Sequence, residues 1–217
     1  LNVPVYASRL ASRLIALEVK QKSAKLKPDL HEVAAGEKIA LGSMSVEFFA
    51  VCHSIPDAMG LIFHTPMGTV VHTGDFKLDH TPVIGQPTDL HSLALLGTRQ
   101  VLLLMSDSTY VELPGYTPSE RTVAESLERI ISDAPGRVIV ATFSSLVSRL
   151  QQVIDIAAKN KRSVVVTGRS MEGIVKVASE AGYLTIPPNT MMKFEQIHNL
   201  PHERVVILTT GTQGEPT

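Results

Sequence analysis

The most constraining feature of the sequence is the alternation of continuously apolar segments with amphipathic ones over residues 118–217. The amphipathic segments carry apolar residues at helical spacing, as in "SSLVSRLQQVIDIAAKNK". The apolar segments are short: "RVIVATF", "SVVVTG" and "RVVILTTG". Buried strands of this kind, separated by helices, are typical of a parallel sheet covered by helices on both faces. The sequence therefore predicts an α/β fold with a parallel sheet flanked by helices.

The first half of the sequence follows a different pattern. The stretches "EKIALGSMSVEFFAVCHSI" and "GLIFHTPMGTVVHTGDF" alternate apolar and polar residues around turns at Gly42–Ser43 and in "TPMG". They predict a β-meander over residues 36–75. A helix is expected next, from Thr88 or Asp89 to Gly97. The segment "VLLLM" after it is expected to be a buried strand.

The change of pattern predicts two domains, residues 1–117 and residues 118–217. The segment "TPSE" at this boundary has the signature of a helix start. Thr117 is expected to cap that helix, with Pro118 in the first turn and Glu120 completing a capping box.

The composition narrows the functional classes. The chain of 217 residues has a formal net charge of -1, so no global basic field draws it to nucleic acid, although a local basic channel is compatible with this charge. Its single cysteine, Cys52, excludes an internal disulfide and a cysteine-based zinc site. This cysteine usage fits a reducing, cytoplasmic compartment. No apolar run is long enough to span a membrane.

Polar clusters follow several of the predicted strands, where ligands bind in α/β sheets. His53 follows "EFFAV" and Asp75 follows "TVVHTG". Imidazole and carboxylate are common ligands of zinc and manganese, which makes this pair a candidate metal site. The alternative is a capped turn in which Asp75 accepts hydrogen bonds from backbone amides. His64 and His72 alternate with apolar residues and are interpreted as half-buried strand residues.

Four further residues are candidates for roles in a site. Asp107 in "SDST" fits either an Asx turn or a carboxylate that orients a metal-bound histidine. Ser144 and Ser145 in "TFSSL" fit either helix caps or hydroxyl ligands of a phosphate. Arg169 in "TGRSMEG" stands beside a predicted helix N-terminus and is a candidate anion contact.

Seven segments, in this order and with close spacing, resemble ribonuclease J, a family in the β-CASP branch of the metallo-β-lactamase-fold nucleases. They are "VCHSIPDAMGLIFHTPMGTVVHTGDFKLDHTPV", "LLLMSDST", "PGYTPSE", "PGRVIVATFSS", "VTGRSME", "GYLTIP" and "VVILTTGTQGEP". The resemblance covers nearly the whole chain. It implies a partial metallo-β-lactamase αββα domain in residues 1–117 and most of a β-CASP domain in residues 118–217.

The resemblance also implies roles for particular residues. His53 and Asp75 match metal ligands of the family, and the matching aspartate bridges two ions, usually zinc (Zn2+) with manganese (Mn2+) also used. These two residues would form the catalytic part of the site in this chain. Asp107 matches the first acidic position of the β-CASP branch, which we interpret as a support of the metal ligands. The loops with Ser144, Ser145 and Arg169 match loops on the RNA side, for substrate binding.

The activity implied by the resemblance is hydrolysis of RNA phosphodiesters by two metal ions, as an endonuclease and as a 5′-to-3′ exonuclease, in RNA processing and decay. RNA is then the main partner. A homo-oligomer and an RNA-degradation complex are further expected partners, in the cytoplasm and away from membranes.

The sequence departs from the family pattern at two places. The main metal motif of the family, H-x-H-x-D-H, is absent from these residues, so we expect the chain alone to bind metal weakly and not to cleave RNA. In "TFSSLVSR", Leu146 and Ser148 stand where the family commonly has asparagine and histidine. This difference weakens the expectation of RNA phosphate contacts at that loop.

Two other functions remain open from sequence. A non-catalytic relative that only binds RNA or scaffolds a degradation complex would have lost the upstream metal motif, which an intact nuclease keeps. A metallo-β-lactamase-fold hydrolase of a small ester or lactone would lack a β-CASP-like insertion, so the alternating second half disfavours it.

Overall fold

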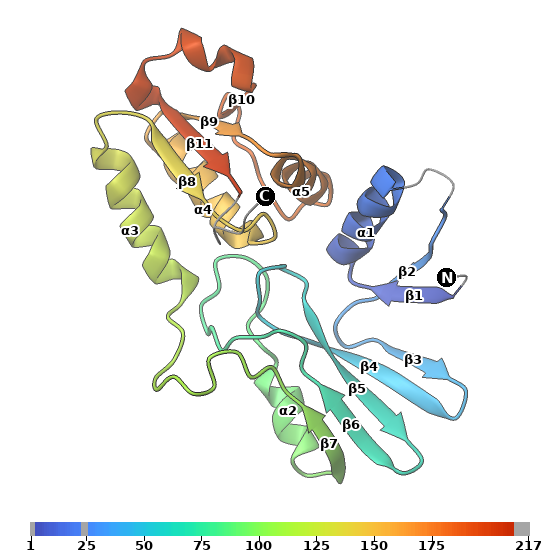
Figure 1. The fold of residues 1–217 in the computed structure, drawn as a ribbon. Helices are drawn as coiled ribbons and strands as arrows, with labels where there is room; N and C mark the ends of the chain where they lie inside the picture. The colour runs from blue at the N-terminus through green and yellow to red at the C-terminus, as the bar shows by residue number, and fades with distance from the viewer. Residues whose placement is uncertain (1–2, 23–25, 211–217) are drawn as a thin grey trace. The chain divides into compact units, whose positions relative to one another are not determined.

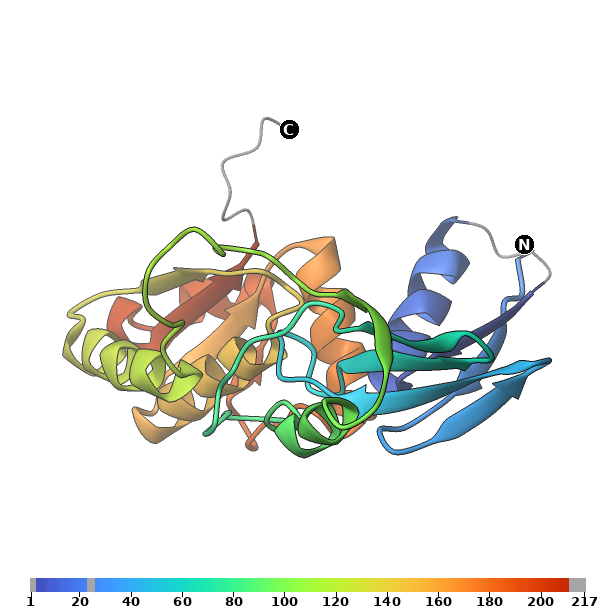
Figure 2. The ribbon, with the colours of Figure 1, turned by 90° about the horizontal axis from the view of Figure 1, so that it is seen from below.

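The computed structural model describes residues 3–22 and 26–210, and Figure 1 and Figure 2 show its helices and strands. The chain divides into two compact units, Leu1–Ser119 and Glu120–Thr217, and each is described by itself. The segment "GTQGEPT", most of which belongs to the last of the family-like segments, lies outside the described residues. Within those residues, no helix is both long and apolar enough to cross a membrane.

The first unit is built on a five-stranded sheet in the order β3-β4-β5-β6-β7. Neighbours from β3 to β6 are antiparallel, which confirms the predicted meander and the turn at Gly42–Ser43. The last strand, β7, is parallel to β6. The strands are β3 (Lys38–Leu41), β4 (Met44–Ala50), β5 (Met59–Thr65), β6 (Gly68–His72) and β7 (Val101–Met105).

A smaller β-α-β element precedes this sheet. Strand β1 (Pro4–Ala7) leads into helix α1 (Arg9–Lys22), and β2 (Asp29–Glu32) returns parallel to β1. Strand β2 lies within the mostly polar stretch "PDLHE", and only Leu30 of its four residues is partly buried.

Both faces of the central strands carry apolar side chains. On one face, Phe49, Ile62 and Val71 pack with Leu96 of helix α2 (Leu90–Leu96). On the other face, Val46 and Phe48 pack with Val33. The period-2 alternation of β4 therefore divides its side chains between two apolar clusters. Helix α2 begins as the sequence predicts, because Asp89 accepts the Ser92 backbone N–H at 3.0 Å.

Strand β7 forms where the sequence predicts it, but the predicted burial is wrong. All five of its residues are exposed, with Leu102 at 58% and Leu104 at 57%. The strand lies at the edge of the sheet, so it has a neighbour on one side only. The side chains of α2 cover β4, β5 and β6, and the apolar cluster that they form includes no β7 residue.

The second unit contains a four-stranded, fully parallel sheet in the order β10-β9-β11-β8. Helices α3 to α5 flank it (Figure 1), which confirms the α/β fold with a helix-flanked parallel sheet. Two short 3-10 helices, Phe194–Asn199 and His202–Arg204, precede the last strand. The other elements are α3 (Glu120–Asp133), β8 (Val138–Ala141), α4 (Val147–Lys159), β9 (Ser163–Val166), α5 (Arg169–Glu180), β10 (Met191–Met192) and β11 (Val205–Thr209).

Helix α3 begins at Glu120, so the predicted cap at Thr117 and the predicted first turn at Pro118 are wrong. The Glu120 carboxylate accepts two hydrogen bonds from the Arg149 guanidinium of α4, at 2.7 and 3.2 Å. Gln152 of α4 donates to the Glu120 carbonyl at 2.9 Å. Long-range bonds from α4 therefore engage the residue that was expected to close a local capping box.

Helix α4 is the most deeply buried helix of the second unit, and this generates a stability prediction. We expect Ile154→Ala, at a fully buried site, to lower the free energy of unfolding by about 2–5 kcal/mol, because it leaves a cavity. Ile130→Ala on α3 is the matched control, since Ile130 is 58% exposed and should change stability by about 0.5 kcal/mol or less. Denaturant unfolding of both variants checks this, and equal losses would contradict the packing described.

Candidate metal-ligand edge of the sheet

Strands β4, β6 and β7 finish on the same side of the five-stranded sheet, and this row of C-terminal strand ends is called the metal-ligand edge below. Strands β4 and β6 are both antiparallel to β5, so they run in the same direction, and β7 is parallel to β6. The residues that follow these strands therefore lie at the same edge. They include His53 after β4, Asp75 after β6 and Asp107 after β7, the three residues that the sequence analysis selected in the first unit.

A backbone bridge joins the loops that carry His53 and Asp75. Cys52 and Lys77 form an isolated antiparallel bridge, with the Lys77 N–H donating to the Cys52 carbonyl at 2.8 Å. The buried Thr88 hydroxyl accepts the Cys52 N–H at 3.0 Å and donates to the Lys77 carbonyl at 2.9 Å. His53 follows one bridge residue and Asp75 precedes the other by two positions, so the two side chains start from adjacent backbone.

The two candidate ligands are both exposed at this edge. His53 Nδ1 is hydrogen-bonded to Ser54 Oγ at 3.1 Å, which leaves Nε2 as the ring nitrogen able to bind a ligand. A hydrogen bond at the second ring nitrogen is the usual arrangement of a metal-binding histidine. The expected alternative for Asp75, a carboxylate capping its own turn, is not what the structure shows, because no described residue donates a hydrogen bond to that carboxylate.

The turn that presents Asp75 depends on a glycine. Gly74 has φ of 63°, and a Cβ there would lie 3.3 Å from the Met59 carbonyl oxygen. Its N–H donates to His72 Nδ1 at 2.9 Å, so the exposed His72 ring accepts a backbone bond within the turn. The other strand histidine, His64, is partly buried and pairs with Glu47 at 2.9 Å, away from this edge.

Asp107 supports the turn from the neighbouring strand end. Its Oδ1 accepts the Thr109 N–H at 2.9 Å, which forms the Asx turn that was one of the two alternatives for this residue. Its Oδ2 accepts the Phe76 N–H at 3.3 Å, directly after Asp75. The Thr109 hydrogen bonds hold the pKa of Asp107 below its ordinary value, against an opposing effect of desolvation, and the Phe76 N–H and the charge of His53 lower it further.

The donor types at this edge fit a borderline divalent cation such as zinc, which binds imidazole nitrogen and carboxylate oxygen. Two such donors leave half of a four-coordinate shell to other groups. No group of three or more His, Cys, Asp or Glu side chains within residues 3–22 and 26–210 is arranged to hold a metal ion. The edge therefore offers two donor groups, fewer than a full coordination shell needs.

The predicted substrate-binding residues lie at strand ends of the second unit. Ser144 and Ser145 do not cap α4, because its N-cap is Leu146 and no side chain bonds there. Ser144 Oγ instead lies 3.0 Å from Ser170 Oγ in the first turn of α5. Arg169 is the exposed first residue of that helix. The structure thus brings the loop that contains Ser144 close to the start of α5, and the Arg169 side chain stays exposed.

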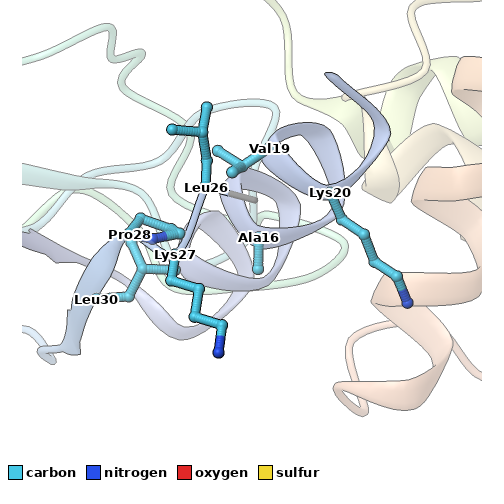
Figure 3. Close-up of a pocket in the computed structure, with 7 residues that line it drawn as sticks. All are labelled: Ala16, Val19, Lys20, Leu26, Lys27, Pro28 and Leu30. Carbon is cyan, nitrogen blue, oxygen red and sulfur yellow. The ribbon is translucent and has the colours of Figure 1, made fainter. Parts of the chain in front are cut away.

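A pocket of the first unit lies elsewhere. It has a volume of about 400 Å³ and is lined by Ala16, Val19 and Lys20 of α1 and by Leu26, Lys27, Pro28 and Leu30 (Figure 3). None of the candidate site residues lines it. It therefore adds nothing to the arrangement of His53, Asp75 and Asp107.

Three supporting residues were not identified from sequence. Asp57 accepts the Leu10 N–H at the start of α1 at 2.8 Å, 47 positions away in the chain. Thr88 and Thr73 carry hydroxyls that bridge strand ends. Each of the three is a small polar residue beside an apolar run, which is also the composition of an ordinary turn. The local sequence therefore does not distinguish a residue that supports the site from a polar residue in an ordinary turn.

Comparison with known proteins agrees with the fold. The family described as "Ribonuclease J, beta-CASP domain" matches residues 135–217. Ribonuclease J of Synechocystis sp. is 43% identical over 99% of this chain and 34% of its own length. Ribonuclease J of Thermus thermophilus is 44% identical over 99% of the chain and 38% of its own length. Ribonuclease J2 of Bacillus subtilis is 39% identical over 100% of the chain and 39% of its own length.

One solved structure supports the fold alone. The crystal structure of a protein of unknown function from Enterococcus faecalis superposes with a TM-score of 0.67 at 18% identity, over 97% of this chain and 54% of that one.

The fold and the family match define an α/β protein whose second unit contains a β-CASP domain. The chain belongs to the ribonuclease J family, with about 40% identity along its whole length. It spans between 34% and 39% of the length of these three relatives.

The hydrogen bonds of Asp107 generate a prediction about its pKa. Thr109→Val removes the hydroxyl and keeps the backbone N–H, so the pKa of Asp107 should rise part of the way toward its ordinary value. Because the pKa is lowered in the folded state, Asp107 stabilises the fold above the unfolded pKa of about 3.9, and this contribution is lost as pH falls through the folded value. Carboxyl NMR titration of both proteins checks the direction. An unchanged Asp107 midpoint would contradict it.

Proposed function

We propose that this chain is part of a metal-dependent ribonuclease that hydrolyses RNA phosphodiesters with two divalent ions, as an endonuclease and as a 5′-to-3′ exonuclease. The observation that carries the proposal is the meeting of His53, Asp75 and Asp107 at one sheet edge in a chain similar throughout to proteins named ribonuclease J. RNA processing and decay are the corresponding roles.

Within this proposal, the first unit is part of a metallo-β-lactamase domain. The support is a mixed sheet whose strand ends carry an imidazole and a carboxylate, with a helix packed on one face. The domain division proposed from sequence, residues 1–117 and 118–217, falls beside the division into compact units at Ser119.

His53 Nε2 and the Asp75 carboxylate are the two proposed metal donors of this chain, for zinc (Zn2+) or manganese (Mn2+). Bound ions of this kind lower the pKa of water and stabilise charge on an attacked phosphate. The residues of the chain hold and orient the donors. Ser54 fixes the His53 ring through Nδ1, and Asp107 holds the backbone after Asp75.

On the second unit, the proposed RNA contacts are Ser144, Ser145 and Arg169. The support is that Ser144 meets Ser170 at the start of a 12-residue helix, where backbone N–H groups and the helix dipole favour a phosphate. The exposed Arg169 guanidinium suits a phosphate oxygen pair. Ser148, at a position where the family commonly has histidine, is buried.

Homo-oligomerisation, an RNA-degradation complex and a cytoplasmic location are further parts of the proposal. They rest on the resemblance to the family.

The bridging role of Asp75 generates a direct prediction. In a full-length ribonuclease J that carries this segment, Asp75→Asn should lower RNA cleavage by more than about 100-fold, because loss of even an outer-shell partner of a metal ligand costs 10- to 100-fold. The fold should be unchanged, since Asp75 is exposed. Cleavage of a 5′-labelled RNA and thermal unfolding of the same preparations measure both effects.

Asp29→Asn is the matched control, because Asp29 is an exposed aspartate on β2 outside the site. It should leave cleavage unchanged. Full activity of Asp75→Asn would exclude Asp75 as a ligand. RNA binding without cleavage by the unmutated protein would instead favour the non-catalytic RNA-binding or scaffold function.

A further inference from the structure

Asp75 combines two properties that require an explanation. Its carboxylate is exposed and accepts no hydrogen bond from the described residues, so its own side chain does nothing to fix its position. It also lies in a loop, where backbone is more mobile than in strands. A ligand that must meet a cation with defined geometry needs its Cα held by other groups.

The peptide plane before Asp75 is held by Thr73. This residue is 5% exposed, and its hydroxyl donates to the Gly74 carbonyl at 2.7 Å. The Gly74 carbonyl and the Asp75 N–H belong to the same planar peptide group. Fixing that carbonyl therefore fixes the plane that enters the Asp75 Cα.

The peptide plane after Asp75 is held by Asp107. The Phe76 N–H, which belongs to the plane leaving the Asp75 Cα, donates to Asp107 Oδ2 at 3.3 Å. The backbone N–H of Asp107 in turn donates to the Thr73 hydroxyl at 3.0 Å. The two supports thus meet, and the hydrogen bonds close a ring that runs from Thr73 through Gly74, Asp75 and Phe76 to Asp107 and back.

We propose that the buried Thr73 hydroxyl is a positioning group for Asp75, which locks both peptide planes around its Cα so that the free carboxylate meets a divalent cation without rearrangement. The inference rests on the proposed function, because it assigns Asp75 to a metal. Thr73 itself touches no ligand in this account. Its hydroxyl is the only group in the ring that both donates to one side of the Asp75 turn and accepts from the residue that holds the other side.

The test compares Thr73→Val, which keeps the shape and removes the hydroxyl, with Thr73→Ser, which keeps the hydroxyl, in the 217-residue chain. Hydrogen exchange of the Asp107 and Phe76 amides, followed by NMR, reports the ring without any metal. Thr73→Val should speed their exchange by roughly 5- to 10-fold, the worth of one hydrogen bond, and Thr73→Ser should restore it.

The same variants are then titrated with MnCl2, and paramagnetic broadening of the Gly74 amide gives the Mn2+ affinity. Thr73→Val should weaken it roughly 10-fold, and Thr73→Ser should recover it. Thr65→Val is the matched control, because the Thr65 hydroxyl also donates to a glycine carbonyl, that of Gly68, at 2.7 Å, but in the hairpin turn at the other end of β6. It should leave Mn2+ affinity unchanged.

The outcomes distinguish a failure of the Thr73 positioning role from a failure of the metal assignment of Asp75. Unchanged amide exchange in Thr73→Val overturns the ring. Faster exchange with unchanged Mn2+ affinity shows a merely structural hydroxyl and overturns the positioning role, while the metal assignment of Asp75 stands. Absence of Mn2+ broadening near Asp75 in the unmutated chain overturns the metal assignment and the positioning role together.

Discussion

The antiparallel bridge between Cys52 and Lys77 is the interaction on which the candidate site depends. It joins the loop after β4 to the loop after β6 through a backbone hydrogen bond, and the buried Thr88 hydroxyl bonds to both residues. Strand direction alone brings these loops to the same edge, but the bridge brings their backbones into contact. Without it, the loops that carry His53 and Asp75 would lose their direct backbone connection.

In the candidate site, the two donors are exposed, and the side chains that support them are partly or fully buried. An imidazole nitrogen and a carboxylate that must bind a ligand have to remain free of other partners, so they cannot hold themselves in place. Their positions are set instead by the backbone and by side chains one step away, such as Ser54, Thr73 and Asp107. Hydroxyls suit this task because one small group both donates and accepts.

The sequence predicts much of this arrangement, and the failures have a common cause. Period-2 and helical patterns locate the meander, α2, α4, α5 and the strands β8, β9 and β11 because these elements are defined by local spacing and burial. The capping box at Glu120 fails because Arg149 and Gln152, about thirty residues away, take its side chain and carbonyl. Likewise, strand ends identify His53, Asp75 and Asp107, whereas Thr73 and Thr88 act through partners that are distant in the chain and leave no local pattern.

The central claim is that His53 and Asp75 bind one divalent ion between them. The most direct test is a crystal structure of a full-length ribonuclease J carrying this segment, grown with Mn2+, with anomalous scattering recorded at the manganese edge. The account predicts an anomalous peak within bonding distance of both the Asp75 carboxylate and His53 Nε2. A fully occupied manganese site elsewhere in the protein, with no peak beside these two side chains, would contradict it.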